Sequence, residues 1–262
     1  MLTFLFRLLT QLSSRRTLSY LAGCLAKSRL SKGLIPLFIK VYGIDVSEAE
    51  QPPDCYPHLN AFFTRRLKEG ARPIDPHPSS VISPVDGKIT ALGAISADAR
   101  LAVKGEIYTV NDLLNDRSLS RKYDGGHFIV IYLSPKDYHR IHAPASGQVV
   151  KSVRVKGKTY PVHPRSLAAI RGILAKNERL ISYLETGKGE IALIKIGAMN
   201  VASIRWSDRL TSHRVTKGDE LAYFEFGSTV VMLFERDTFR FVPGLQAGDG
   251  IKMGQPVGYQ LH

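Results

Sequence analysis

The chain has 262 residues, of which 44% are hydrophobic, so it can fold around a substantial core. Its 36 Lys and Arg against 23 Asp and Glu give a net charge of +13, which indicates an anionic partner such as a membrane, a nucleic acid or an acidic substrate. The two cysteines lack metal-type spacing and read as reduced thiols, which excludes a disulfide framework, and no uninterrupted apolar segment is long enough to span a bilayer.

The first 44 residues contain no acidic residue; the first is Asp45. Apolar residues recur at helical spacing within 5–12, 18–25 and 34–42, and basic residues lie between them. This pattern predicts short amphipathic helices that lie in a membrane interface, so residues 1–44 are assigned to a membrane-associating helical segment. The alternative is that these apolar stripes pack on the protein's own core. Arg7 interrupts the first stripe, so a signal peptide is not expected.

Residues 45–80 are predicted to form a connector, with a helix at 59–67 and an extended proline-rich stretch at 71–78. Residues 81–262 are predicted to form a β-rich catalytic domain, because β-branched and aromatic runs alternate there with turn signals. The expected strands are 88–92, 127–133, 148–155, 180–184, 191–196, 201–205, 221–226 and 229–234, followed by a hairpin-like unit at 239–260.

Two stretches echo each other: Ser83-Pro84-Val85-Asp86-Gly87 and Ala143-Pro144-Ala145-Ser146-Gly147. In both, a proline is followed by two residues, a glycine and then the start of a strand. Such echoes favour a core built from similar hairpins. The predicted fold class is α+β, with N-terminal amphipathic helices followed by a mainly antiparallel catalytic core that resembles a β barrel or sandwich.

A Gly-Ser-Thr sequence at 227–229 interrupts two predicted strands, and such local conflicts tend to mark functional or strained sites. Gly227 has no Cβ, so its carbonyl can be approached closely. The Ser228 hydroxyl is placed to attack this carbonyl. The alternative is an ordinary bulge or turn.

Asp137 to His142 follow a predicted buried strand, and His139 and His142 are suited to general acid–base work or to metal binding. Together with Asp86 and Ser228 they supply the parts of a Ser-His-Asp arrangement. Asp86, His139 and His142 could instead hold zinc, and Asp86 alone could simply bond the amides of its own turn. Ser228 lacks the strand–turn–helix setting of an ordinary serine hydrolase.

The stretches Ser83–Gly87, Asp137–His142 and Phe226–Thr229 resemble the three signature stretches of the phosphatidylserine decarboxylase family. Phe62–Arg65 and Arg72–Asp75 are similar to the lead-in segment of that family. The resemblance covers essentially the whole chain and is closest to the short bacterial form.

Two small departures accompany the resemblance. Phe226 stands where many members have Leu, and Ala222 stands where Gly is common. Neither side chain belongs to a reacting group.

The resemblance implies a proenzyme that cuts itself between Gly227 and Ser228 into a β chain, 1–227, and an α chain, 228–262. It implies that His142 removes the Ser228 proton, with Asp86 stabilising the ring, and that Ser228 becomes a covalent pyruvoyl group. This cofactor would form a Schiff base with phosphatidylserine and support its decarboxylation to phosphatidylethanolamine. His139 would protonate the carbanion, and Asp137 would steady one histidine.

The resemblance also implies the partners of the chain. These are an anionic phospholipid membrane that carries phosphatidylserine and the heterodimer of the chain's own two products; no nucleic acid and no metal are expected. The location implied is the cytoplasmic side of the cell membrane, peripherally bound, with further homo-oligomerisation left open. Two rival interpretations are a zinc peptidase and a non-enzymatic membrane or nucleic-acid module.

Overall fold

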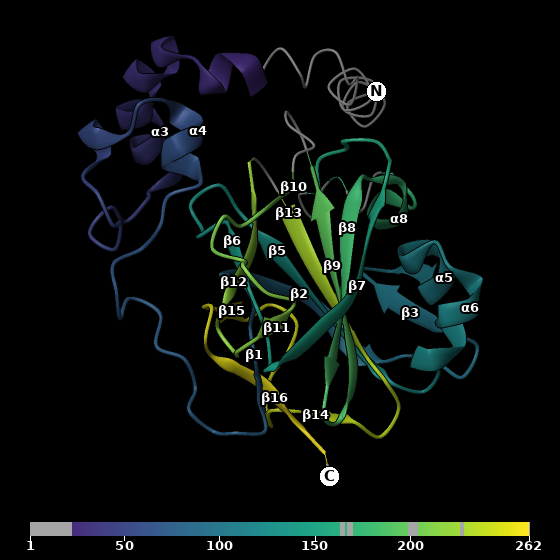
Figure 1. Ribbon diagram of the computed structural model, residues 1–262. Helices are drawn as coiled ribbons and strands as arrows, with labels where there is room; N and C mark the ends of the chain where they lie inside the picture. The colour runs from purple at the N-terminus through teal and green to yellow at the C-terminus, as the bar shows by residue number, and fades with distance from the viewer. Residues whose placement is uncertain (1–22, 163–165, 167–169, 199–203, 226–227, 262) are drawn as a thin grey trace.

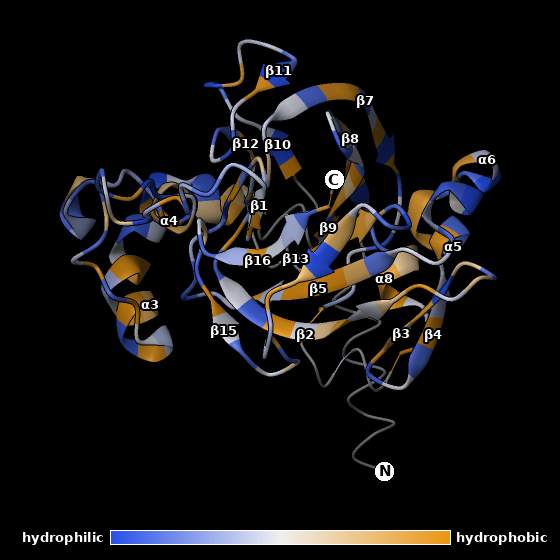
Figure 2. Ribbon diagram, turned by 90° about the horizontal axis from the view of Figure 1, so that it is seen from below, coloured by the Kyte–Doolittle hydropathy of each residue, from blue (hydrophilic) through white to orange (hydrophobic). Residues whose placement is uncertain are grey.

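The computed structural model of the chain describes residues 23–162, 166, 170–198, 204–225 and 228–261. A β-rich body lies between two helical groups (Figure 1): α3 and α4 flank it on one side, and α5 and α6 with strand β3 flank it on the other. The turned view in Figure 2 shows the same separation. The predicted helices at 5–12 and most of 18–25 lie outside the described residues.

The N-terminal helical group contains residues 23–27, the 3₁₀ helices η1 (Arg29–Leu34) and η2 (Pro53–Cys55), and the α-helices α3 (Ile35–Tyr42) and α4 (Leu59–Phe63). Pro36 lies in the first turn of α3, where its missing N–H costs nothing, and Gly43 ends the helix with φ 60°. The His58 side chain accepts from the Ala61 amide at the start of α4. This helix ends earlier than predicted because the chain leaves it to form a bridge between Leu67 and Ala49.

The largest sheet has eight antiparallel strands in the order β11-β7-β8-β9-β13-β5-β2-β15. Their bounds are β2 (Gly87–Ala94), β5 (His127–Leu133), β7 (Gly147–Val155), β8 (Arg179–Thr186), β9 (Gly189–Gly197), β11 (Arg214–Val215), β13 (Ser228–Phe234) and β15 (Gly250–Ile251). Strand β13 is buried along its whole length between β5 and β9. Ser228 is its first residue and pairs with Leu133 and Gly197. The strand thus holds Ser228 at one end of the core.

Different elements cover the two faces of this sheet. One face packs against two three-stranded sheets, and the other packs against a hairpin and short helices. The first group is β1 (Ser80–Ile82), β16 (Pro256–Gln260) and β14 (Phe239–Phe241), with β10 (Ile204–Trp206), β12 (Glu220–Phe224) and β6 (Arg140–His142). The second group is β3 (Arg100–Val103), β4 (Glu106–Thr109), α5 (Val110–Leu114), α6 (Arg117–Ser120), η3 (Arg121–Tyr123) and α8 (Ile173–Lys176).

The predicted fold class is confirmed as α+β with a sandwich-like antiparallel core. No sheet in the described part of the chain closes on itself. Of the two predicted arrangements, the core is therefore a sandwich and not a barrel. The strand predicted at 201–205 is observed at Ile204–Trp206, and residues 199–203 and 226 lie outside the described set. The elements between 95 and 123 were not predicted. The predicted domain boundaries at 44 and 80 stay predictions.

The described helices include none that is long and apolar enough to cross a membrane.

Candidate active site

The Ser228 hydroxyl lies against the His139 ring, with Oγ 3.4 Å from Nδ1. On its other side, His139 Nε2 is 3.0 Å from the Ser134 carbonyl oxygen. A carbonyl oxygen can only accept, so Nε2 carries the hydrogen and Nδ1 is free to accept from Ser228. Both residues are fully buried. The arrangement is a serine against a neutral imidazole whose far side is fixed by the backbone.

The surroundings of His139 keep its ring neutral. Burial, together with the nearby charge of Arg65, lowers the pKa of His139 to about 3. Phe63, the last residue of α4, stacks on the ring with centroids 4.0 Å apart and planes 27° apart. The N-terminal helical group therefore forms one wall of the site. At neutral pH His139 is an uncharged acceptor for the Ser228 hydroxyl.

His142 faces different partners. Its Nδ1 donates to the Gly218 carbonyl oxygen at 2.7 Å, and its Nε2, 3.1 Å from the Tyr138 hydroxyl, is left to accept from it. Burial lowers the pKa of His142, although the bond to Gly218 and the charge of Glu220 act in the opposite direction. Side chains three residues apart in an extended segment point to opposite faces, which explains why His139 meets Ser228 and His142 meets Gly218.

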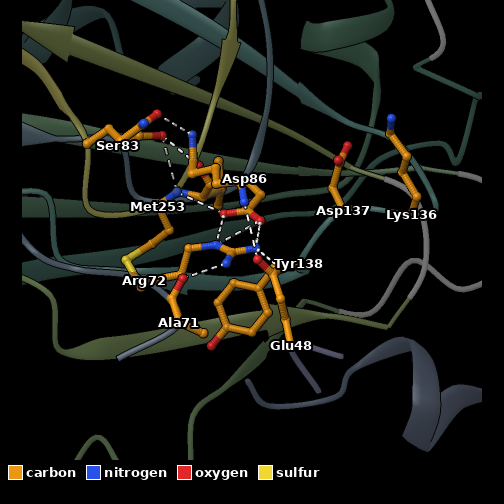
Figure 3. Close-up of polar contacts among 12 residues, drawn as sticks. Glu48, Ala71, Arg72, Ser83, Asp86, Lys136, Asp137, Tyr138 and Met253 are labelled. Carbon is orange, nitrogen blue, oxygen red and sulfur yellow. Dashed lines mark hydrogen bonds and ion pairs between the residues drawn. The ribbon is translucent and has the colours of Figure 1, made fainter. Parts of the chain in front are cut away.

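Asp86 forms a buried ion pair with Arg72 (Figure 3). Arg72 Nε donates to the two carboxylate oxygens at 2.9 and 3.1 Å, and Nη2 bridges Asp86 and Glu48. The Met253 amide also donates to Asp86, at 2.8 Å. Several donors thus hold the carboxylate, and its charge acts against the burial that lowers the pKa of His142.

Asp137 closes its own turn. Its carboxylate accepts from the amide and the hydroxyl of Ser134, both at 2.7 Å. Because Ser134 also supplies the carbonyl that fixes His139, Asp137 supports this ring through the turn without touching it. Gly227, the other residue of the predicted cleavage site, lies outside the described residues.

The structure brings Ser228 together with His139, and it gathers Asp86 and His142 around neighbouring turns. It gives Ser228 no direct contact with His142 among the described hydrogen bonds. The sequence analysis gave no role to Arg65, Arg72 or Tyr138, although all three lie in segments that carried the family resemblance. For the two arginines a signal was available, since they are basic residues within an otherwise apolar or proline-rich stretch.

A cleft of about 530 Å³ opens beside His142. Its lining includes His142 and Tyr138, and it also carries several charged side chains: Arg66, Lys68, Arg72, Arg209, Arg214, Glu50, Asp219 and Glu220. Ser228 and His139 are not part of this lining. Within the described residues, no three His, Cys, Asp or Glu side chains are arranged to hold a metal ion, so Asp86, His139 and His142 do not form such a group.

Comparison with known proteins gives a single answer. The family model described as phosphatidylserine decarboxylase matches residues 59–259. A phosphatidylserine decarboxylase proenzyme from Geobacillus sp. (strain WCH70) is 42% identical over 259 residues, which covers 99% of both chains. Proenzymes of the same name from Bacillus mycoides (strain KBAB4) and Anoxybacillus flavithermus (strain DSM 21510 / WK1) are each 40% identical over 98–99% of this chain and 97% of their own length.

Proposed function

The chain belongs to the phosphatidylserine decarboxylase family, a family of carboxy-lyases, and we propose that it converts phosphatidylserine to phosphatidylethanolamine after cutting its own backbone between Gly227 and Ser228. The observation that carries the proposal is the buried Ser228 hydroxyl at the start of β13, 3.4 Å from the unprotonated nitrogen of a neutral histidine. The relatives are named proenzymes, which fits a chain made in an uncut form.

In the proposed cutting step, Ser228 Oγ attacks the Gly227 carbonyl carbon, the peptide C–N bond breaks and an ester forms. Elimination then breaks the Cβ–Oγ bond of Ser228 and leaves a carboxylate at Gly227 and a dehydroalanine at the new end. Water adds to the dehydroalanine and ammonia leaves, which gives a pyruvoyl group. The resemblance assigns the Ser228 proton to His142, with Asp86 stabilising the imidazolium. His139 holds the hydroxyl before it reacts.

The site suits a pyruvoyl group, because Ser228 is dry and the neighbouring Thr229 hydroxyl is buried without a hydrogen-bond partner. A pyruvoyl group held at the start of β13 would supply an electron sink for the loss of CO2 from the substrate. His139 is the proposed proton carrier to the substrate carbon, since it is the ionisable group nearest to Ser228 in the described hydrogen bonds. Asp137 would steady its position through the Ser134 turn.

The two products of cutting are proposed to stay together as a heterodimer. The shorter product begins with β13, which lies between β5 and β9 of the longer one and is paired with both along its length. Breaking the bond before Ser228 leaves the pairing of residues 229–234 with both neighbouring strands in place. The buried apolar residues of β13 therefore hold the products together.

We propose that α3 and the 3₁₀ helix before it rest on an anionic membrane surface. Leu30, Leu34, Leu37 and Val41 follow helical spacing and are 84%, 45%, 58% and 64% exposed. Lys and Arg residues accompany them at 27, 29, 32 and 40, which favours contact with anionic lipid. The neighbouring face of α3 reaches the site, because Phe38 contacts Phe63 and Phe63 stacks on His139. Peripheral attachment at the cytoplasmic face would place the site at its lipid substrate.

Membrane contact is tested with the double variant Leu37→Glu, Val41→Glu. We expect cutting to stay normal and binding to vesicles containing anionic lipid to fall about tenfold or more, because two exposed apolar contacts are lost. Sedimentation with vesicles measures this. The matched control is Ile107→Glu, because Ile107 is also exposed but lies on the far side of the body. This variant should bind vesicles as the wild type does. Unchanged vesicle binding by the double variant would contradict the proposal.

Self-cutting is tested by intact mass spectrometry of three variants. Ser228→Ala and His142→Ala should remain single chains without activity, whereas His139→Ala should be cut and fail to decarboxylate. An uncut His139→Ala would transfer the base role to His139, in line with its contact to Ser228. A fully active, uncut wild-type chain with Ser228 intact, or activity that follows stoichiometric zinc, would refute the pyruvoyl mechanism.

A further inference from the structure

Of Arg65, Arg66, Arg72 and Arg140, which lie near the candidate residues, three have a carboxylate partner. Arg72 pairs with Asp86 and Glu48, Arg140 pairs with Glu220, and Arg66 is 2.7 Å from Asp208. Arg65 takes part in none of the ion pairs among the described residues. It is the exception that needs an explanation.

The Arg65 guanidinium is buried and only partly satisfied. Its side chain leaves the end of α4 and the residue is 4% exposed. Nη2 donates to the Lys136 carbonyl oxygen at 2.9 Å, and the group lies over the Phe62 ring at 5.1 Å. Nε and Nη1 are closed to solvent and have no partner. Buried charges and buried N–H donors are costly unless they are paired, so the fold keeps two strong donors free at a price in stability.

The nearest acids do not take up these donors. Asp137 is bound by the amide and hydroxyl of Ser134, and Asp86 is bound by Arg72 and by the Met253 amide. Burial lowers the pKa of Arg65, although the charges of Asp86 and Asp137 act in the opposite direction. Both carboxylates thus attract the charge of Arg65, but they accept their hydrogen bonds from other groups. An anion from outside the chain is the partner that would complete the group.

Arg65 lies close to the reacting centre. Phe63, two residues earlier, stacks on the His139 ring, and Lys136 belongs to the same loop as His139. The charge of Arg65 is close enough to His139 to be the second cause of its lowered pKa. His139 in turn touches Ser228. The free donors therefore belong to the same buried cluster as the nucleophile.

We propose that Arg65 binds the phosphodiester of the phosphatidylserine head group through Nε and Nη1. The proposal rests on the proposed function, which supplies a substrate with two anions, a carboxylate and a phosphodiester. A guanidinium on the carboxylate would stabilise the charge that must leave as CO2 and would oppose the reaction. The phosphodiester keeps its charge throughout and lies only a few covalent bonds from the amino group. Binding it fixes the amine near Ser228 without resisting decarboxylation.

The experiment compares processed wild-type protein with Arg65→Met and Arg65→Lys. The control is Arg179→Met, since Arg179 is 2% exposed and its nitrogens all donate to carbonyls such as those of Leu113, Asp112 and Ala175, away from the site. We expect both Arg65 variants to be cut normally, with KM for short-chain phosphatidylserine raised about 100-fold for Arg65→Met and kcat within a few-fold. The control should keep the wild-type KM.

A second readout needs no turnover. Dimethyl phosphate should raise the Tm of the wild type and of Arg179→Met but not of Arg65→Met, and acetate at the same concentration should not raise it. A wild-type KM in Arg65→Met, equal protection by acetate, or loss of cutting in both Arg65 variants would overturn the proposal. A wild type that neither cuts nor decarboxylates refutes the proposed function instead, and the dimethyl phosphate result then still decides whether Arg65 is an anion site.

Discussion

Two turns of the molecule are built alike and carry different chemistry. The first is Ser83–Gly87 and the second is Ala143–Gly147, the two echoes of the sequence. They lie side by side: the Ile82 amide donates to the Pro144 carbonyl at 2.9 Å, and the His142 amide donates to the Pro84 carbonyl at 2.9 Å. The exchange is reciprocal, because Ile82 and His142 hold equivalent positions in front of the two prolines.

In each turn, the fourth residue accepts a hydrogen bond from a backbone amide of a distant loop. Asp86 accepts from the Met253 amide at 2.8 Å, and Ser146 accepts from the Lys217 amide at 3.0 Å. The loops are themselves alike, because Gly254 and Gly218 follow with φ 91° and 92°. A serine hydroxyl is therefore sufficient for the structural bond at this place.

What the first turn adds is a buried negative charge held by Arg72, and what the second turn adds is His142 where the first has Ile82. Neither addition is needed to build the turn, since the other copy does without it. The comparison thus separates the structural role of Asp86 from its charge. The charge and the imidazole, one from each copy, are the parts that we assign to chemistry.

The largest effect is expected from Asp86→Ser, which gives the first turn the residue of the second. We expect the chain to fold, with the free energy of unfolding lowered by about 3 kcal/mol because Arg72 keeps only Glu48 as partner. Cutting should slow about 100-fold or more, because a hydroxyl cannot stabilise a protonated His142. Intact mass over time and urea denaturation measure the two effects.

Asp86→Asn is the companion variant for that experiment, since it keeps the shape and an acceptor for the Met253 amide. If Asp86→Ser were cut at the wild-type rate, the charge would have no part in the chemistry and Asp86 would be a turn residue like Ser146.

The sequence predicts the parts of the molecule that local pattern controls. The strand at 127–133 is observed with those bounds, and 229–234 is observed as Ser228–Phe234, because continuous apolar β-branched runs specify buried strands. The region 95–123 was missed because its elements are short. A signal was present there, since Thr109 and Asp112 form a capping box at the start of α5.

In the candidate site too, the sequence identifies the residues but not their contacts. Asp86, His139, His142 and Ser228 stand out by residue type and position, and the structure places them in one end of the core. Their partners depend on contacts distant in sequence, as when Ser228 reaches His139 or His142 reaches Gly218, and a single sequence does not specify such contacts. The free donors of Arg65 are likewise visible only after the burial around α4 is known.

Two buried histidines, His139 and His142, precede the second turn. Because burial lowers the pKa of both, the stability of the fold is expected to depend on pH. The folded pKa of His139 is about 3, below its ordinary value of 6.5. Between these values the unfolded chain binds a proton that the folded chain does not, so stability is present above pH 6.5 and is lost as the pH falls towards 3. His139 alone should cost about 2 kcal/mol between pH 8 and pH 5.

Urea denaturation of the uncut Ser228→Ala chain at several pH values measures this loss. His139→Phe in the same background keeps a ring against Phe63 and should reduce the slope, although His142 contributes in the same direction. The same loss of stability on acidification in both chains would show that the His139 ring is not the group that resists protonation.

The smallest expected effect is that of Ser146→Ala in the second turn. This change removes the acceptor of the Lys217 amide, and the contact is exposed, so water replaces the lost partner. We expect the free energy of unfolding to fall by about 1 kcal/mol or less, with cutting and decarboxylation unchanged. The matched change Asp86→Ala removes the same structural bond and the charge together, and should lose both stability and cutting. If Ser146→Ala slowed cutting as much as Asp86→Ser, both turns would act through the shape of the site, and the assignment of a separate role to the Asp86 charge would fail.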